Sequence, residues 1–350
     1  MTARSMGRSK VVVAAIVMSI FGFICQANGQ EFVIGIVDFY GLRQISESRA
    51  REALTFKEGD TLVLNSERPA ALKESENRLA RLPGVTRAQI SVSCCDTGRV
   101  IVYVGVEERG APTMRFRAEP TGPARLADDI MRSGEEFSTA LMRAVERGDA
   151  AEDHSQGHAL AHNPITRAIQ ERFVTYAKRD LSQLRLVLWS SGDAAHRALA
   201  ALVLGYAPDK QAVVEDLVNG ISDPADEVRN NAMRALLVFA DMDPAASRNA
   251  PRIPPEPFIA LLNSPVFSDR NKASGALMAL SASRDPGLLA TLQKEALTPL
   301  VEMARWKSAG HALFAFTILG RIAGYSDETA HDLWDRGNRE VVIEAAIKWQ

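Results

Sequence analysis

A short internal repeat constrains the fold of this chain more than any other feature. The stretch VRNNAMRAL, residues 228–236, returns at residues 269–277 as DRNKASGAL, which keeps the arginine, one asparagine, two alanines and the final leucine. HRALAALVL, residues 196–204, fits the same frame, and HALFAFTIL, residues 311–319, fits it more loosely. The pattern contains no recognisable catalytic motif. Its recurrence therefore indicates a structural unit that is built several times.

The repeating unit is predicted to be a pair of helices. Its arginine position falls at residues 197, 229, 270 and 312, where the last is an alanine. An apolar segment with helical periodicity precedes each copy, at residues 181–189, 212–221, 257–264 and 297–306. One such pair cannot bury both of its apolar faces, whereas stacked pairs share a continuous core. We expect an all-α solenoid over residues 181–325 and a C-terminal helical cap over residues 326–350.

Residues 30–109 have a different pattern, which predicts a small α+β domain. Its order is strand, helix, helix, strand, strand, and residues 56–62 are interpreted as a turn between the first helix and the second. DTG, residues 96–98, is a hairpin turn signal between the last two strands. A three-stranded sheet of this kind leaves two edges open. We expect the edge beside the second helix to accept an extended peptide through main-chain hydrogen bonds.

Residues 110–180 are predicted to be a helical connecting region that contains three histidines in a row of spacing four. On a continuous helix, His154, His158 and His162 would share one face, which is an arrangement that can hold a metal ion. Gly157 weakens a helix at that point, and Asn163–Pro164 is typical of a helix end. We therefore predict a polar helix face or a loop, without tight zinc binding and without a cofactor.

The first residues have the features of a secretory signal peptide. Arg4, Arg8 and Lys10 precede an apolar run over residues 11–25, and small residues favour cleavage after Ala27. We expect residues 1–27 to be removed and the protein to be periplasmic or secreted; an uncleaved N-terminal anchor is the alternative. The formal net charge of −2 argues against a nucleic-acid partner, which a strong positive field would attract.

Cys94 and Cys95 are the only cysteines after the predicted signal peptide. The Cα atoms of neighbouring residues lie about 3.8 Å apart across a trans peptide bond, below the usual range for a disulfide. We therefore predict two free thiols. The C-x-x-C spacing of many metal sites is absent from the sequence.

Residues 30–109 resemble a POTRA (polypeptide-transport-associated) domain. The matching stretches are EALTFKEGDTL, LARLPGVTRAQI and VIVYVGVEE, in that order. In that family such domains stand in the bacterial periplasm and bind extended polypeptides by strand addition. The resemblance implies a partner in the cell envelope, including outer-membrane assembly machinery. This sequence contains only one copy of the pattern, which departs from the usual context of the family.

The repeats resemble HEAT repeats, in particular the short type named after phycobilisome lyases. The strongest match is ISDPADEVRNNAMRALLVFAD, residues 221–241, in which Asp223–Pro224 would open the second helix and Asp223 or Asp226 would cap it. Taken together, the chain resembles exported bacterial HEAT-repeat proteins. We expect Arg229 and Arg270 to be structural and to pair with nearby aspartates between repeats.

These patterns favour a non-catalytic scaffold or adaptor that binds a protein or peptide in the cell envelope. The concave side of a solenoid presents the second helices of its repeats. The predicted partner-binding residues are Asn230, Asn231, Arg234, Asn271 and Lys272. One alternative is an enzyme, either of the lyase type or metal-dependent through the three histidines, although the common catalytic motifs are absent. Another alternative is an accessory factor in outer-membrane assembly.

Overall fold

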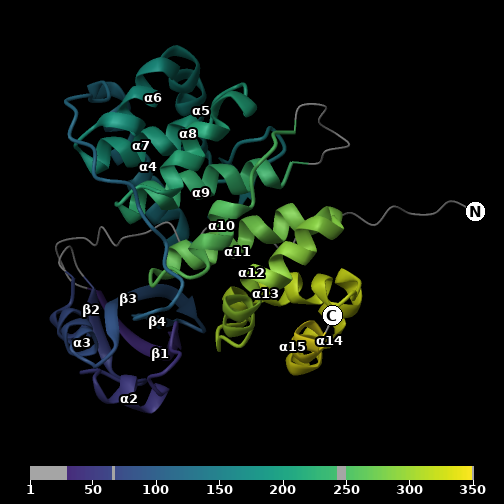
Figure 1. Ribbon diagram of the computed structural model, residues 1–350. Helices are drawn as coiled ribbons and strands as arrows, with labels where there is room; N and C mark the ends of the chain where they lie inside the picture. Colours follow the sequence, from purple (N-terminus) through teal and green to yellow (C-terminus); the bar gives the residue numbers. More distant parts are fainter. Residues whose placement is uncertain (1–29, 65–67, 243–249, 349–350) are drawn as a thin grey trace, which may run out of the picture.

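The computed structural model describes residues 30–64, 68–242 and 250–348. A small sheet region at the N-terminal end of these residues is followed by helices to the C-terminal end (Figure 1). The predicted signal peptide, residues 1–27, lies outside the described residues. No helix in the described part of the chain is long and apolar enough to cross a membrane.

The N-terminal region is a mixed four-stranded sheet with two helices on one face. Its strands follow the order β2-β1-β4-β3, in which β1 pairs parallel with β4 and antiparallel with β2. Its elements are β1 (Gln30–Tyr40), α2 (Glu47–Glu52), β2 (Thr61–Leu64), α3 (Ala70–Ala80), β3 (Val85–Asp96) and β4 (Arg99–Glu108).

The prediction of three strands was wrong by one, because the end of the predicted turn is the strand β2. In β2 the side chains of Leu62 and Leu64 are buried, whereas Thr61 and Val63 are exposed. This alternation is the strand period, but four residues are too few to show it clearly in a sequence. The edge beside the second helix is nevertheless present, as the outer edge of β3.

The structure also corrects the prediction for the two cysteines. Cys94 and Cys95 form a disulfide, and the peptide bond between them is cis. The prediction of two free thiols was therefore wrong: the two residues are bonded although their Cα atoms lie 3.1 Å apart, below the usual range for a disulfide.

After β4, residues 109–127 form no helix, so the predicted helical connecting region, residues 110–180, is helical only from Asp128 onward. The later described residues form helices, their connecting turns and a short hairpin. The predicted helix pairs are α6 with α7, α8 with α9, α10 with α11, and α12 with α13, and the second helices contact one another in succession. The helices α14 and α15 lie against α13 at the C-terminal end (Figure 1). The bounds are α4 (Asp128–Glu146), β5 (Glu152–Asp153), β6 (Leu160–Ala161), α5 (Pro164–Arg179), α6 (Leu181–Ser190), α7 (Ala194–Leu204), α8 (Gln211–Ile221), α9 (Asp226–Ala240), α10 (Glu256–Leu261), α11 (Phe267–Leu280), α12 (Pro286–Ala304), α13 (Ala309–Ile322), α14 (Asp327–Asp335) and α15 (Arg339–Lys348).

Buried ion pairs join successive helix pairs at the turns. Arg197 of α7 donates two hydrogen bonds to Asp223, both 2.9 Å long, and Arg229 of α9 does the same to Asp269. The predicted pairing of Arg229 with a nearby aspartate between repeats is thus confirmed, and the aspartate belongs to the next helix pair. Neither Asp223 nor Asp226 caps α9, which begins after Ala225 without a side-chain cap. The Asp223 carboxylate binds Arg197 and Arg117 and accepts a hydrogen bond from the Ala225 amide.

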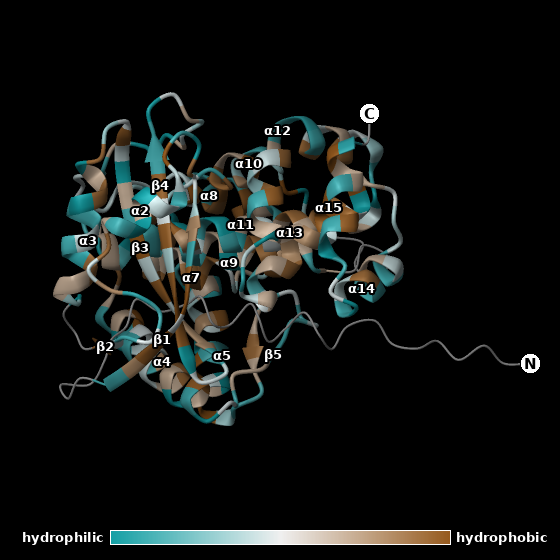
Figure 2. Ribbon diagram, turned by 90° about the horizontal axis from the view of Figure 1, so that it is seen from below, coloured by the Kyte–Doolittle hydropathy of each residue, from teal (hydrophilic) through white to brown (hydrophobic). Residues whose placement is uncertain are grey.

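The helices of each pair approach closely where the frame contains alanine. Ala232 on α9 is fully buried, and a Cβ atom added to Gly220 on α8 would lie 3.0 Å from the Ala232 Cβ. There is no room here for a larger side chain. Figure 2 shows the hydrophobic residues gathered where the helices meet, for example on α11 and α13.

We therefore expect Ala232→Leu to lower the free energy of unfolding by about 1–3 kcal/mol, because extra methyl groups overpack the core. Urea denaturation would measure the change. Ala168→Leu is the matched control, since Ala168 is exposed on α5 and its replacement should change stability by less than about 0.5 kcal/mol. Equal stability of the two variants would contradict the repeat frame.

The second face of the sheet packs against the turns of the helix stack. Tyr40 and Tyr103 point away from α2 and α3, and the Tyr103 ring stacks on Phe267 with 4.0 Å between the ring centroids. The Tyr40 hydroxyl donates a 2.9 Å hydrogen bond to the Pro265 carbonyl. Trp306 packs beside both tyrosine rings. The sheet and the helices thus share a core, so they are not independent binding modules.

Two charged residues of the helix stack complete this contact. The Glu302 carboxylate accepts a 2.6 Å hydrogen bond from the Gly41 amide and another of 2.6 Å from Arg270. Lys307 donates a 2.9 Å hydrogen bond to the Val37 carbonyl on β1. Arg270 is structural as predicted, but its partner is a glutamate of the following helix pair and not an aspartate.

Candidate protein-binding site

The histidine-rich segment between α4 and α5 is a hairpin and not a helix. The strands β5 and β6 pair antiparallel, and Gly157 lies in the turn between them at φ +72°, a conformation that favours glycine. Asn163 begins α5, because its side chain accepts hydrogen bonds from two backbone amides of the first turn. The Asn163–Pro164 signal therefore marked a boundary correctly, but it starts a helix and does not end one.

The hairpin separates the three histidines. His154 lies 3.8 Å from both Glu152 and Asp241, the His158 ring faces Tyr206, and His162 is exposed. The shared helical face on which a metal site was considered does not form. Among the residues that the structure describes, no group of three or more His, Cys, Asp or Glu side chains could hold a metal ion.

The hairpin is held on the helix stack by a buried ion pair. The Glu152 and Arg234 residues are 4% and 2% exposed, and the guanidinium donates two hydrogen bonds to the carboxylate, one of them 3.0 Å long. Gln170 on α5 donates a third, 3.2 Å long. Burial acts to raise the pKa of Glu152, but the Arg234 charge, His154 and the Gln170 hydrogen bond outweigh it and lower the pKa to about 2. Glu152 therefore stays ionised inside the protein.

Two more titratable groups lie around this pair. Burial, together with the Arg234 charge, lowers the pKa of Lys272 on α11 to about 7. His154 behaves in the opposite way: burial acts to lower its pKa, but Asp241 and Glu152 outweigh burial and raise the pKa above its ordinary value. Arg234 and Lys272 are thus both buried basic side chains, and Arg234 is the one that contacts Glu152.

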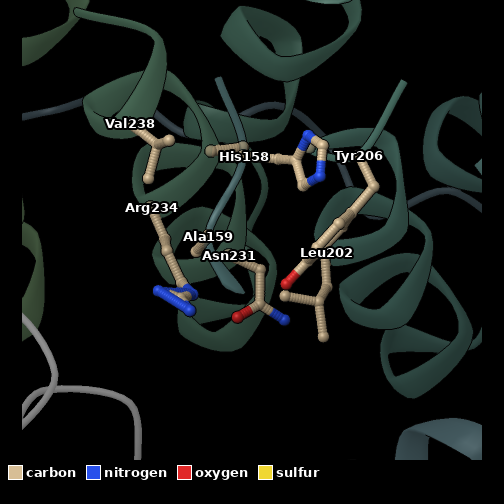
Figure 3. A pocket seen from close by; sticks show the side chains of 9 residues that line it. His158, Ala159, Leu202, Tyr206, Asn231, Arg234 and Val238 are labelled. Carbon is tan, nitrogen blue, oxygen red and sulfur yellow. The ribbon is translucent and has the colours of Figure 1, made fainter. Parts of the chain in front are cut away.

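A small pocket opens beside the ion pair. Its volume is about 10 Å³, room for about one water molecule, and its wall is formed by the hairpin, α7, α9 and the turn after α7. In Figure 3 the side chains of His158, Tyr206, Asn231 and Arg234 surround this space. Asn231 also donates a 2.9 Å hydrogen bond to the Ala198 carbonyl of α7. The hairpin thus fills its groove almost completely.

The predicted partner-binding residues do not form a solvent-facing surface. Asn230, Arg234, Asn271 and Lys272 are buried, and Asn231 is half-buried. The prediction took polar residues on a second helix to be exposed. In the structure other segments of the same chain cover that side, and the hairpin does so at Arg234 and Asn231. The sequence does show an acidic residue, Glu152, in the segment before α5. No local pattern in the sequence identifies Arg234 as its partner.

The outer edge of β3 is a second candidate surface. At Ile90 the backbone amide donates a 2.6 Å hydrogen bond to the Glu76 carboxylate of α3, and Arg68 donates one of 2.5 Å to the carbonyl. These side chains occupy main-chain groups that an added strand would need. A peptide could pair there only if it displaced Arg68 and Glu76 from Ile90.

A buried histidine links the sheet to the helix stack. The Tyr103 hydroxyl lies 2.6 Å from Nδ1 of His311, whose ring also packs against Phe267. Burial, and then the charge of Lys272, lower the pKa of His311 to about 4. His311 is therefore neutral in the folded protein at neutral pH.

We expect the stability of the folded protein to fall as the pH is lowered from about 6.5 to about 4. In this window the unfolded chain takes up a proton on His311, at an ordinary pKa near 6.5, while the folded chain does not. Urea midpoints measured across this range should fall less for His311→Gln than for the unchanged protein. His331→Gln, at an exposed histidine on α14, should keep the full slope. An unchanged slope in His311→Gln would contradict the assignment.

Comparisons with known proteins give limited information about this chain. No family profile matches, and no curated protein sequence matches significantly. Among solved structures, the chain is similar to a computationally designed armadillo repeat protein for modular peptide recognition, with 15% identity, a TM-score of 0.38 and coverage of 63% of this chain and 98% of that one. Another designed armadillo repeat protein has 16% identity and a TM-score of 0.35, and the match covers 56% of this chain and 97% of that one. An engineered protein has 15% identity and a TM-score of 0.36, and the match covers 63% of this chain and 96% of that one. TM-scores this low carry no argument about a ligand.

Proposed function

We propose that this protein is a non-catalytic scaffold of the bacterial cell envelope that binds a protein or peptide partner on its stacked helices. One observation carries this proposal. The side of the helix stack that includes α7 and α9 already holds a polypeptide hairpin of the same chain, through a buried ion pair and closely packed walls. A surface of this construction is suited to peptide recognition, because the buried arginine selects an acidic side chain and the neighbouring walls contact the adjacent residues.

The envelope location follows from the signal-peptide pattern and from the two family resemblances. In this proposal the sheet region is a POTRA-like domain and the helix pairs are HEAT repeats of the phycobilisome-lyase type. The sheet packs on the helix stack and supports it. The β3 edge of the sheet offers a second contact surface for outer-membrane assembly machinery. The occupied main chain at Ile90 makes the helix stack the stronger candidate of the two.

A photo-crosslinking amino acid placed at Gln156 tests this proposal in cells. Gln156 is exposed at the tip of the hairpin, so a partner on this side should give a discrete protein adduct. The control position is Arg336, which is exposed in the turn after α14 at the far end of the stack. The expected result is an adduct from position 156 only, in the envelope fraction. Adducts from neither position would contradict the scaffold proposal.

A further inference from the structure

The hairpin is attached to the helix stack by a small number of strong interactions. Each of its strands has only two residues, and Ser155 and Gln156 at its tip are exposed. Its polar attachment is concentrated at Glu152, which is bound to Arg234, and at the Ala161 amide, which donates a 2.6 Å hydrogen bond to Gln170. Ala159, Leu160 and Ala161 are buried as well, so the ion pair supplies the charged part of the attachment and these residues supply the apolar part.

The groove beneath the hairpin is complementary to a carboxylate. Arg234 presents two donors to Glu152 in the forked geometry that suits a carboxylate. Removing a buried carboxylate leaves such a guanidinium without compensation, which is strongly unfavourable. Any segment that displaces the hairpin must therefore bring its own acidic side chain.

The residues next to the ion pair favour an extended segment over a lone anion. Leu202, Tyr206 and Val238 lie beside Arg234, together with Asn231, and would be uncovered if the hairpin left the groove. A free carboxylate ion would not cover these apolar walls. An extended chain with an acidic residue could bind Arg234 and also cover them.

We propose that this groove binds an extended acidic segment of a partner protein, whose Asp or Glu side chain replaces Glu152 on Arg234, and that the hairpin is a displaceable latch over the site. This inference rests on the proposed scaffold function and specifies its ligand. The hairpin competes with the partner. The partner's apparent affinity is therefore its affinity for the open groove multiplied by the fraction of molecules in which the hairpin has left the groove.

The test uses the full mature chain and a fluorescent synthetic peptide with the sequence of residues 151–162. Glu152→Gln in the protein weakens the latch, and this variant should bind the peptide about tenfold more tightly than the unchanged protein. Asp153→Asn is the matched control, since Asp153 is the adjacent acid, binds the Ser155 amide and does not reach Arg234. It should bind like the unchanged protein.

Two further reagents separate the outcomes. The same peptide with glutamine at its Glu152 position should lose its binding, and so should the protein variant Glu152→Gln/Arg234→Met with the original peptide. Equal binding of the two peptides would overturn the proposal. Formation of a dimer by Glu152→Gln that excludes the peptide would also overturn it, because the occupant would then be the hairpin of a second copy.

A measurement on the unchanged protein keeps the proposal testable if the variants fold poorly. A saturating concentration of the peptide should speed hydrogen exchange at the Ala161 and His162 amides, which are hydrogen-bonded while the hairpin is seated. Unchanged exchange would show that the hairpin is not displaced and would overturn the inference. The scaffold proposal would then still depend on crosslinking at Gln156 alone.

Discussion

Replacing Asp269 with alanine should lower the free energy of unfolding by about 3–5 kcal/mol, because it leaves the Arg229 guanidinium buried without a charge partner. Asp269 is fully buried and accepts two 2.9 Å hydrogen bonds from Arg229 and one of 2.6 Å from Ser264. Burial raises the pKa of Asp269 above its ordinary value despite the neighbouring arginine. The pair therefore has a large desolvation cost, which is offset only while both members are present.

Urea denaturation at neutral pH would measure this loss, and two variants would assign it. Asp226→Ala removes an exposed acid from the first turn of α9 and should cost less than about 1 kcal/mol. The double variant Asp269→Leu/Arg229→Met removes both charges and should recover most of the stability lost in Asp269→Ala. A double variant as unstable as the single one would show that the ion pair is not the source of the effect.

The helix pairs could be predicted from the sequence because their signal is local and repeated. Three copies of the frame place an arginine three residues before a buried alanine, the fourth keeps the alanine alone, and together they reinforce one interpretation. The partner of Arg229 could also be predicted, since a buried arginine between repeats needs an acid in the next unit. The start of α9 was harder to predict. The sequence favours Asp223 or Asp226 as a helix cap, whereas in the structure Asp223 is the partner of Arg197.

The hairpin could not be predicted, because its conformation depends on what it covers. Residues 152–161 contain two strands of only two residues each, which is too short for any periodicity. The Glu152–Arg234 pair joins positions 82 residues apart, and no local pattern connects them. The predicted partner-binding residues were wrong for the same reason. Polar residues on a second helix are expected to be exposed unless another segment of the chain covers them.

The contact between the sheet and the helices could not be predicted from the sequence either. Alternation in β4 separates Val100, Val102 and Val104 from Ile101 and Tyr103, and both sets are buried. A strand that is apolar on both faces indicates cover on both sides, but it does not identify the cover. The structure shows that one face packs on α2 and α3 and the other on the turns of the stack.

Gly105 on β4 lies at the closest point of this contact. A Cβ atom added there would lie 2.0 Å from the Pro265 carbonyl oxygen and 2.6 Å from the Tyr40 ring. Contacts this short are not tolerated, and the nearest atom belongs to the backbone of the turn before α11 and cannot move aside as a flexible side chain could. Glycine is therefore required here by the close approach of two backbones.

We expect Gly105→Val to lower the free energy of unfolding by at least about 3 kcal/mol, at the upper end of the range for overpacking, since it forces the sheet away from the helix stack. The core between the sheet and its own helices, α2 and α3, lies on the other face and should persist. Hydrogen exchange can resolve this partial opening. The Gly41 amide, which donates to Glu302, should lose protection, while amides of β4 paired with β3 should keep it.

Gly310→Ala is the matched control, because an added Cβ at Gly310 meets no atom within 4 Å and alanine favours the helix α13. Its stability should be equal to or slightly above that of the unchanged protein, with full protection at Gly41. If Gly105→Val folded with protection at Gly41 intact, the sheet could not be docked on Pro265 as described. A docked sheet requires that Gly105→Val loses protection from hydrogen exchange at the Gly41 amide and keeps it at the amides of β4 that pair with β3. This result is expected because the substitution removes only the contact between the sheet and the helix stack.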